Sequence, residues 1–289
     1  MNPRVRVALF RAAGVVLETL PESVDRALAH LGGRIFYRLS AEKRRVVGAN
    51  LAVVLGETDP ARLERLVAAS FDSYAQYWAE SAKLPALAPS VISSRFAITQ
   101  GQEHLVAGVG AGQGVVIALP HLGSWEWGGA FLSRLGMPML AVAEVLDPPE
   151  LFDWFAEKRR QIGIEIAPLD EHAGAVLLSR LRAGGIVGLL CDRDIQGNGV
   201  EVEFFGRRVT LPAGPATLAL RTGAVLVVAA CYSGPGPDHH AIVRPPLDVA
   251  REGRLSADVT RVTQLIAREL EELIRRAPEQ WHVLEERFS

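Results

Sequence analysis

Residues Val115–Trp127 read VVIALPHLGSWEW, a run of five apolar residues followed by a proline, a histidine and the start of a helical pattern. Five consecutive apolar residues predict a strand buried on both faces, because a strand with one solvated face would alternate with polar residues. Further strands are predicted at Leu140–Glu144, Ile164–Pro168 and Ile186–Cys191, with helices at Trp125–Leu135, Pro149–Ile162 and Ala173–Ala183. This alternation predicts an α/β fold with a central, mostly parallel sheet flanked by helices.

The segments on either side extend this prediction. Towards the C-terminus the pattern predicts a hairpin of Val200–Phe205 and Arg207–Leu211, which turns at Gly206, and then a helix from Pro212. Two strands follow at Val225–Tyr232 and Ala241–Val243, and a final amphipathic helix at Val259–Ile274. Towards the N-terminus, Thr58 is a suitable N-cap for a long helix that begins at Pro60. No linker rich in glycine or serine divides the chain. We therefore expect one domain, 1–289, with a helical N-terminal cap over 1–110 and an α/β core over 111–289.

The composition excludes several classes of protein. The 289 residues are 49% hydrophobic and carry a net charge of −2, which excludes an intrinsically disordered chain. The 31 basic residues are balanced by 33 acidic ones, so no nucleic-acid partner is expected. Two cysteines are too few for a disulfide framework or a Cys-rich zinc site, and no metal site is predicted.

The N-terminal region is basic and amphipathic. Its basic residues lie among apolar ones and include Arg4, Arg6, Arg11, Arg26, Arg34, Arg38 and the run 43–45. Such a segment is typical of peripheral contact with an anionic membrane, although an ordinary surface helix explains it equally well. No transmembrane helix is predicted, because the longest apolar runs are far shorter than the ~20 residues that a spanning helix needs.

A histidine and a glutamate flank the turn after the first predicted strand. His121 follows the strand directly, and Glu126 falls in the first turn of the next helix. Across such a junction the two side chains can converge, with Gly123 allowing the tight turn. A carboxylate beside an imidazole holds its tautomer and raises its basicity, as a general base requires. The alternative is that His121 caps the helix and Glu126 only complements the helix dipole.

Two more polar groups are candidates for the same site. Asp192, Arg193 and Asp194 follow another apolar strand, where they could orient a base or bind a polar substrate, or simply form a turn with an ion pair. Arg159 lies in a run of charges on a predicted helix, for which a solvated face is the default. The sequence contains neither the G-x-x-x-x-G-K-[ST] phosphate loop nor the G-x-S-x-G nucleophile elbow.

Several stretches of the chain match one family in their order. They are Ala118–His121 with Trp125 and Glu126, Val142–Glu144, Arg159 ahead of Gly163, Asp192–Asp194, Gly199–Gly206, Pro212–Ala216, and Trp281 with His282. Together they resemble the glycerolipid-type acyltransferases, whose signature is His-x4-Asp/Glu after a strand. More fully, they are similar to the lipid A late acyltransferase superfamily and, within it, to the actinobacterial phosphatidylinositol mannoside acyltransferases. The late lipid A enzymes usually begin with a transmembrane helix, so the expected lack of one favours the peripheral, mannoside-modifying branch at the cytoplasmic face of the plasma membrane.

The resemblance implies transfer of a fatty acyl group from acyl-CoA or acyl carrier protein to a sugar hydroxyl of a membrane glycolipid. It assigns the base to His121 and the acidic position of the motif to Glu126. The family usually carries Glu beside its base, where this chain has Asp192. Glu144 and Arg159 match polar positions that line the family's active-site cavity.

The chemistry of these residues agrees with that assignment. We expect His121 to act as the base and Glu126 and Asp192 to orient it. Arg159 or backbone amides near Gly123 are expected to bind either the oxyanion or the acceptor's phosphate. Arg193 and Asp194 are further candidates for binding substrate. No cofactor is expected, because the thiolate of a thioester is already a good leaving group.

Three alternatives remain open at this point. One is a late acyltransferase that acts on lipid A or another glycolipid. Another is a hydrolase that uses water in place of the sugar. The third is a non-catalytic lipid carrier, which leaves the polar clusters at the strand ends unexplained.

Overall fold

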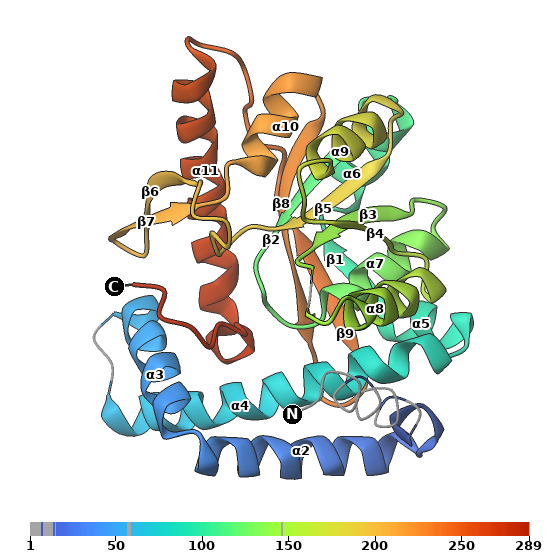
Figure 1. Ribbon diagram of the computed structural model, residues 1–289, viewed down its shortest axis with the longest axis vertical. Coiled ribbons are helices and arrows are strands. Elements are labelled where there is room, and N and C mark those ends of the chain that lie inside the picture. Colours follow the sequence, from blue (N-terminus) through green and yellow to red (C-terminus); the bar gives the residue numbers. More distant parts are fainter. Residues whose placement is uncertain (1–6, 8–13, 15, 57–58, 146, 289) are drawn as a thin grey trace.

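A seven-stranded sheet forms the centre of the molecule (Figure 1). The computed structural model describes residues 7, 14, 16–56, 59–145 and 147–288. The strands are β1 (Phe96–Gln100), β2 (Val115–Leu119), β3 (Met139–Ala143), β4 (Glu165–Pro168), β5 (Ile186–Leu190), β8 (Val225–Ser233) and β9 (His239–Val243). They lie in the order β1-β9-β8-β2-β5-β3-β4, and all neighbours are parallel except β8 and β9. The prediction of a mostly parallel sheet is confirmed.

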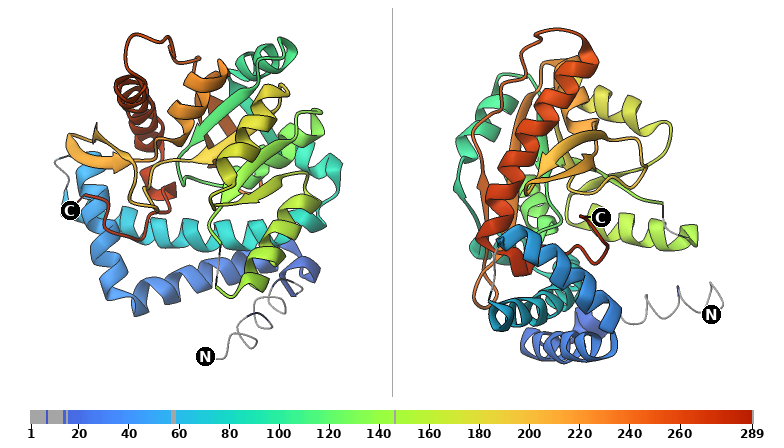
Figure 2. Two further views of the ribbon diagram at one scale, coloured as in Figure 1. Left: turned by 45° about the horizontal axis from the view of Figure 1, so that its top comes forward. Right: turned by 90° about the vertical axis from the view of Figure 1, so that its left-hand side faces the viewer.

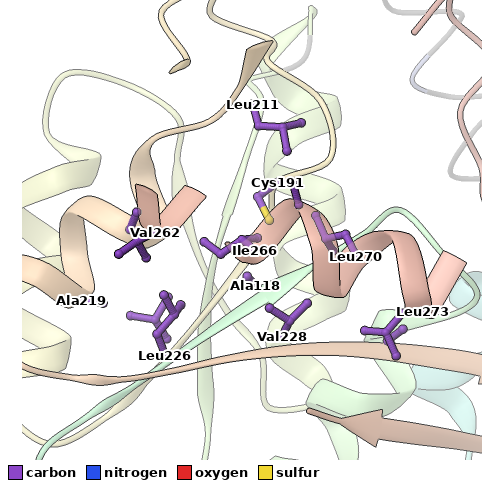
Figure 3. Close-up of a cluster of buried hydrophobic side chains, with 14 of the residues drawn as sticks. Ala118, Cys191, Leu211, Ala219, Leu226, Val228, Val262, Ile266, Leu270 and Leu273 are labelled. Atoms are coloured by element: carbon purple, nitrogen blue, oxygen red, sulfur yellow. The ribbon is translucent and has the colours of Figure 1, made fainter. Parts of the chain in front are cut away.

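Helices cover both faces of this sheet, because successive residues of its apolar strands point to opposite sides. The covering helices include α6 (Gln102–Gly110), α7 (Trp125–Arg134), α8 (Pro149–Gln161), α9 (Ala173–Arg182), α10 (Gly214–Thr222) and α11 (Leu255–Arg276). On one face, α9, α10 and α11 enclose a large apolar cluster. Figure 3 shows part of it, where Ile266 and Leu270 of α11 pack above Leu226 and Val228 of β8. On the other face, Ile117 of β2 packs in a second cluster with residues of α6 and α7.

The predicted hairpin is present as a separate two-stranded sheet. Strand β6 (Val200–Phe204) pairs antiparallel with β7 (Arg207–Leu211). The two residues between them, Phe205 and Gly206, have φ angles of 51° and 71°. Positive φ at both central positions is the backbone of a tight hairpin turn, and it explains the glycine there.

Strand β1 is a departure from the sequence prediction, which expected only helices before residue 110. Its sequence, FAITQ, is short and mostly solvated, with only Phe96 buried. It pairs in parallel with β9 at the edge of the sheet. The helical N-terminal part therefore contributes an edge strand to the sheet of the core.

The N-terminal helices stack beyond one end of the sheet (Figures 1 and 2). They are α2 (Glu22–Leu39), α3 (Ala41–Leu55) and α4 (Pro60–Lys83), and the short elements η1 (Leu84–Ala86) and α5 (Pro89–Arg95) connect them to β1. Helix α4 lies next to the sheet, and α2 lies outside α4. Asp59 caps α4 by accepting the backbone N–H groups of Ala61 and Arg62, each at 3.2 Å. The expected cap, Thr58, lies outside the described residues.

Within the described ranges, no helix is both long enough and apolar enough to cross a membrane. The basic residues Arg4, Arg6 and Arg11 of the predicted membrane segment lie outside those ranges.

Candidate active site

His121 lies at the carboxyl end of β2, in a turn that the end of the chain holds in place. Its backbone carbonyl accepts the N–H of His282 at 2.7 Å, and the N–H of Gly123 donates to the carbonyl of Gln280 at 2.9 Å. Gly123 has φ of 58°, and a Cβ there would lie 2.0 Å from the carbonyl oxygen of Cys231. Only glycine fits this turn. The N–H of Gly123 itself is bonded to Gln280 and is not free to bind an oxyanion.

The imidazole of His121 pairs with the carboxylate of Asp192. Nδ1 of His121 lies 2.6 Å from Oδ1 of Asp192, and the backbone N–H of His121 donates to Oδ2 at 3.0 Å. The indole N–H of Trp281 also donates to Oδ2, at 2.7 Å. An anionic carboxylate accepts from Nδ1–H, so whenever the ring is neutral its lone pair lies on Nε2.

The carboxylate of Asp192 is ionised although it is completely buried. Burial by itself raises the pKa of Asp192, but the charge and hydrogen bonds of His121 and the indole of Trp281 outweigh it and lower that pKa to about 2. His121 keeps 23% of its side chain exposed and faces a cavity of about 600 Å³. The pair thus has the geometry of a general base held in one tautomer, open to a ligand on its other side.

The C-terminal strap, residues 280–287, supports both members of this pair. Besides the contacts of Gln280, Trp281 and His282, the guanidinium of Arg287 donates from Nε to the carbonyl of Asp192 at 2.7 Å. Asn50 of α3 in turn donates to the carbonyl of Glu285 at 2.8 Å and accepts the N–H of Arg287 at 3.1 Å. Trp281 belongs to a stretch that matches the family, but neither its spacing nor that of Arg287 indicates contact with a strand end some ninety residues earlier in the chain.

Glu126 does not join His121, contrary to the expectation from sequence. Its Oε1 accepts the hydroxyl of Tyr77 at 2.9 Å and Nη2 of Arg159 at 3.1 Å, and no hydrogen bond links it to His121 in the described part of the chain. The first turn of α7 directs the carboxylate towards α4 and α8 instead. Tyr77 is a site residue that sequence reasoning missed, since it belongs to an amphipathic pattern in which aromatic residues read as core.

Arg159 is not on a solvated face. Its guanidinium packs over the ring of Trp125, 5.0 Å from the centroid, and its side chain is 18% exposed. Burial by itself lowers the pKa of Arg159, but the charge and the hydrogen bond of Glu126 outweigh it and raise that pKa. Burial, with the charge of Glu126, also raises the pKa of the Tyr77 hydroxyl. The cluster is thus an Arg159–Glu126 ion pair whose carboxylate also accepts the hydroxyl of Tyr77.

This cluster lies between two cavities. The larger, of about 600 Å³, contains His121, and the smaller, of about 390 Å³, is bounded by α2, α4 and α8. Trp78, Phe155 and Arg159 line both. The smaller cavity has a mostly apolar wall that includes Leu28, Gly32, Ala75, Ala79, Ala82 and Trp154.

The remaining predicted residues line the larger cavity. Glu144 is exposed at the end of β3. Asp194 accepts the backbone N–H groups of Gly197 and Gly199 at 3.0 and 2.8 Å, so it shapes the following loop. Arg193 pairs with Glu285 of the C-terminal strap at 3.2 Å. Among the described residues, no group of three or more histidine, cysteine or acidic side chains is placed to hold a metal ion.

The sequence is similar to that of several known proteins. The sequence model of the bacterial lipid A biosynthesis acyltransferase family matches residues 3–289. Phosphatidylinositol mannoside acyltransferases of two Mycobacterium tuberculosis strains are 35% identical over 281 residues, covering 96% of this chain and 86% of theirs. The protein of that name from Mycolicibacterium smegmatis is 33% identical over 279 residues, covering 96% of this chain and 89% of its own.

A more distant likeness is to the crystal structure of the 1-acyl-sn-glycerophosphate acyltransferase PlsC from Thermotoga maritima. It covers 86% of this chain and 97% of PlsC, at 12% sequence identity and a TM-score of 0.41. A score that low supports no inference about function.

Proposed function

The chain belongs to the bacterial lipid A biosynthesis acyltransferase family, and from that premise we propose that it transfers a fatty acyl group from a thioester to a sugar hydroxyl of a membrane glycolipid. The observation that carries this proposal is the His121–Asp192 pair, which presents a free imidazole nitrogen to a cavity. The proposed acceptor class is phosphatidylinositol mannoside, the acceptor that the names of the mycobacterial relatives indicate. A lipid A-type acceptor is the alternative.

In the proposed reaction, Nε2 of His121 takes the proton of the acceptor hydroxyl as its oxygen attacks the thioester carbonyl. General-base assistance of this kind contributes about 10²–10⁴-fold to the rate. The buried carboxylate of Asp192 stabilises the imidazolium that forms. The carbon–sulfur bond then breaks, and the imidazolium returns its proton to the leaving thiolate.

Two features of the cavities support a division of the substrates between them. The apolar wall of the smaller cavity suits the hydrocarbon chain of the acyl group. The larger cavity carries His121, Glu144, Arg193 and Asp194, whose polar groups suit the sugar. Arg159 lies where the two cavities meet, and there its charge stabilises the oxyanion of the tetrahedral intermediate.

We propose acyl-CoA or acyl carrier protein as the donor and expect no cofactor, because a thioester is activated already. The acceptor is a membrane lipid, so the protein works at a membrane surface. We place it at the cytoplasmic face of the plasma membrane, because both donors are available on that side.

The test is transfer from palmitoyl-CoA to a panel of purified glycolipids, comparing the wild type with His121→Ala. His172→Ala is the matched control, because the side chain of His172 is 77% exposed and lines neither cavity. We expect the wild type and H172A to acylate a mannosylated phosphatidylinositol, and H121A to lose at least two orders of magnitude in kcat.

Other outcomes separate the alternatives. Acylation of lipid A precursors alone would favour the lipid A-type enzyme. Thioester loss that is independent of any acceptor would favour a hydrolase. A carrier would be favoured if the protein bound lipid equally well with and without His121→Ala and transferred no acyl group from either donor.

A further inference from the structure

Helix α2 carries a row of exposed apolar side chains. Five large apolar residues are 40–80% exposed on it, namely Val24, Leu28, Leu31, Ile35 and Leu39. Their spacing of three or four residues places them on one side of the helix, along roughly 22 Å at 1.5 Å per residue. We call these five residues the α2 stripe. Single exposed apolar residues are common, whereas a continuous row marks an interaction surface.

The charged residues of α2 differ in whether they are paired. Both of its acidic residues are held in ion pairs. Glu22, whose side chain is 36% exposed, pairs with Arg95 at 2.7 Å, and the buried Asp25 pairs with Lys83 at 3.1 Å. The charged residues that are exposed on α2 are both arginines, Arg34 and Arg38, and in the described chain neither side chain has an ion-pair partner. The exposed residues along the stripe are therefore apolar or cationic, and the one acidic residue of α2 that keeps some exposure, Glu22, is neutralised by Arg95.

The position of α2 adds a second observation. It is the outermost of the stacked N-terminal helices, so no described element of this chain covers its outer side (Figures 1 and 2). Leu28 of the α2 stripe and its neighbour Gly32 also line the smaller, apolar cavity. The apolar surface of α2 thus continues into that cavity.

We infer that the α2 stripe lies in the interface of an anionic lipid bilayer, with Arg34 and Arg38 at the level of the phosphates and the smaller cavity adjoining the lipid. Helices that lie in a membrane plane combine an apolar face with basic residues and immerse the apolar face about 5–10 Å. A second copy of the chain would have to bring acidic groups to face Arg34 and Arg38, and both acidic residues of α2 are already paired. The inference rests on the proposed function only in that the acceptor is a membrane lipid.

The test is flotation with vesicles of equal parts phosphatidylglycerol and phosphatidylcholine, and with vesicles of phosphatidylcholine alone. The variant L31D/I35D places charges in the α2 stripe at residues that line neither cavity. The matched control V106D/L135D changes two other exposed apolar residues, which are 50% and 42% exposed and lie on α6 and at the end of α7. The third variant, R34Q/R38Q, removes only the charge.

We expect the wild type and V106D/L135D to float with the anionic vesicles and L31D/I35D to remain at the bottom, a loss of at least tenfold in bound protein. R34Q/R38Q should lose about fivefold in affinity per arginine for anionic vesicles. In about 1 M salt, where the Debye length is about 3 Å, the wild type should fall to the level of R34Q/R38Q.

Equal flotation of the wild type and L31D/I35D would overturn the inference, as would absence of the wild type from both kinds of vesicle. A wild-type dimer in solution that L31D/I35D converts to a monomer would assign the stripe to a second copy instead. Transfer of a short acyl group from hexanoyl-CoA to methyl mannoside, without vesicles, reports separately on the proposed function. L31D/I35D should retain that activity, so a failure of chemistry and a failure of membrane binding are distinguishable.

Discussion

Asp192 binds His121 twice, through the imidazole Nδ1 at 2.6 Å and through the backbone N–H at 3.0 Å. The carboxylate therefore holds both the ring and the turn that carries it. We expect Asp192→Asn to lower kcat by about 10³–10⁴-fold, because an amide that donates to Nδ1 imposes the wrong tautomer. Steady-state kinetics measure kcat of the variant and the wild type, and circular dichroism checks that both are equally folded. An Asn variant within tenfold of the wild type would contradict the assignment of the pair.

Trp281 donates to the carboxylate of Asp192 and lines neither of the two cavities. Trp281→Phe removes the donor to Oδ2 of Asp192, a charged hydrogen bond of the kind worth about 1.5–3 kcal/mol. We expect kcat to fall about tenfold with KM unchanged. Trp127→Phe is the control, since the buried indole N–H of Trp127 has no hydrogen-bond partner in the described chain. Equal losses in the two variants would mean that packing, not this bond, matters.

Glu126 pairs with Arg159 and not with His121. Glu126→Gln leaves the largely buried guanidinium of Arg159 without its counter-charge, and breaking such a pair costs on the order of 3 kcal/mol. We expect E126Q to lower the free energy of unfolding by about that amount, and E126Q/R159M to recover part of it. Chemical denaturation of the wild type and the three variants E126Q, R159M and E126Q/R159M gives the interaction energy of the pair by a double-mutant cycle. A large loss of kcat in E126Q with unchanged stability would instead place Glu126 on His121.

Gly32 sets the room available in the smaller cavity. A Cβ at this position meets no heavy atom within 4 Å, so Gly32→Leu fills open space without strain. If the acyl chain lies there, kcat/KM should shift towards donors shorter by two or three carbons. Each excluded methylene costs about 0.8 kcal/mol, or about fourfold. Gly110→Leu, also in open space but at the end of α6, is the control, and an unchanged chain-length profile in G32L would place the chain elsewhere.

Glu80 and His239 share one proton in a small polar cluster beside α4. Oε2 of Glu80 lies 2.9 Å from Nε2 of His239. Burial raises the pKa of Glu80 to about 7, and burial with nearby positive charges lowers that of His239 to about 4. Between these values the folded pair holds one proton, on Glu80. The unfolded pair also holds one proton between pH 4.5 and 6.5, on the histidine, so the wild type should show little pH dependence from this pair.

Single substitutions of Glu80 and His239 should give the free energy of unfolding opposite dependences on pH. In Glu80→Gln only the lowered pKa of His239 remains, so the free energy of unfolding should fall as the pH drops from 6.5 towards 4. In His239→Gln only the raised pKa of Glu80 remains, so it should fall as the pH rises from 4.5 towards 7. Urea denaturation across that interval measures both. Parallel slopes in the two variants would contradict the shared proton.

Much of the fold was predictable from local patterns. The apolar runs that became β2, β3, β4 and β5 differ from the predicted strands by at most one residue at either end. Such runs are local signals, since five apolar residues need burial on both faces wherever the chain takes them. Strand β1 has no such local signal, because FAITQ is largely solvated and forms a strand by pairing with β9. It was therefore not predicted from the sequence.

The candidate site was predictable only in part. The sequence placed His121 and Asp192 at strand ends, and β2 and β5 are neighbours in the sheet, so their ends meet. The sequence offered both Asp192 and Glu126 as partners of the imidazole, and spacing alone did not decide between them, because both lie one loop or one turn from a strand end. The direction of the first turn of α7, set by packing against α4 and α8, decided it.

The sequence by itself determined the parallel sheet, the hairpin, the position of His121 at the end of a buried strand and the family to which the chain belongs. Only the tertiary structure decided the partners: Asp192 for His121, Arg159 for Glu126, and the strap that carries Trp281 to the carboxylate. Burial and backbone geometry follow from residues close together in the chain. Hydrogen-bond partners depend on which distant elements pack together, and a single sequence does not encode that in its spacing.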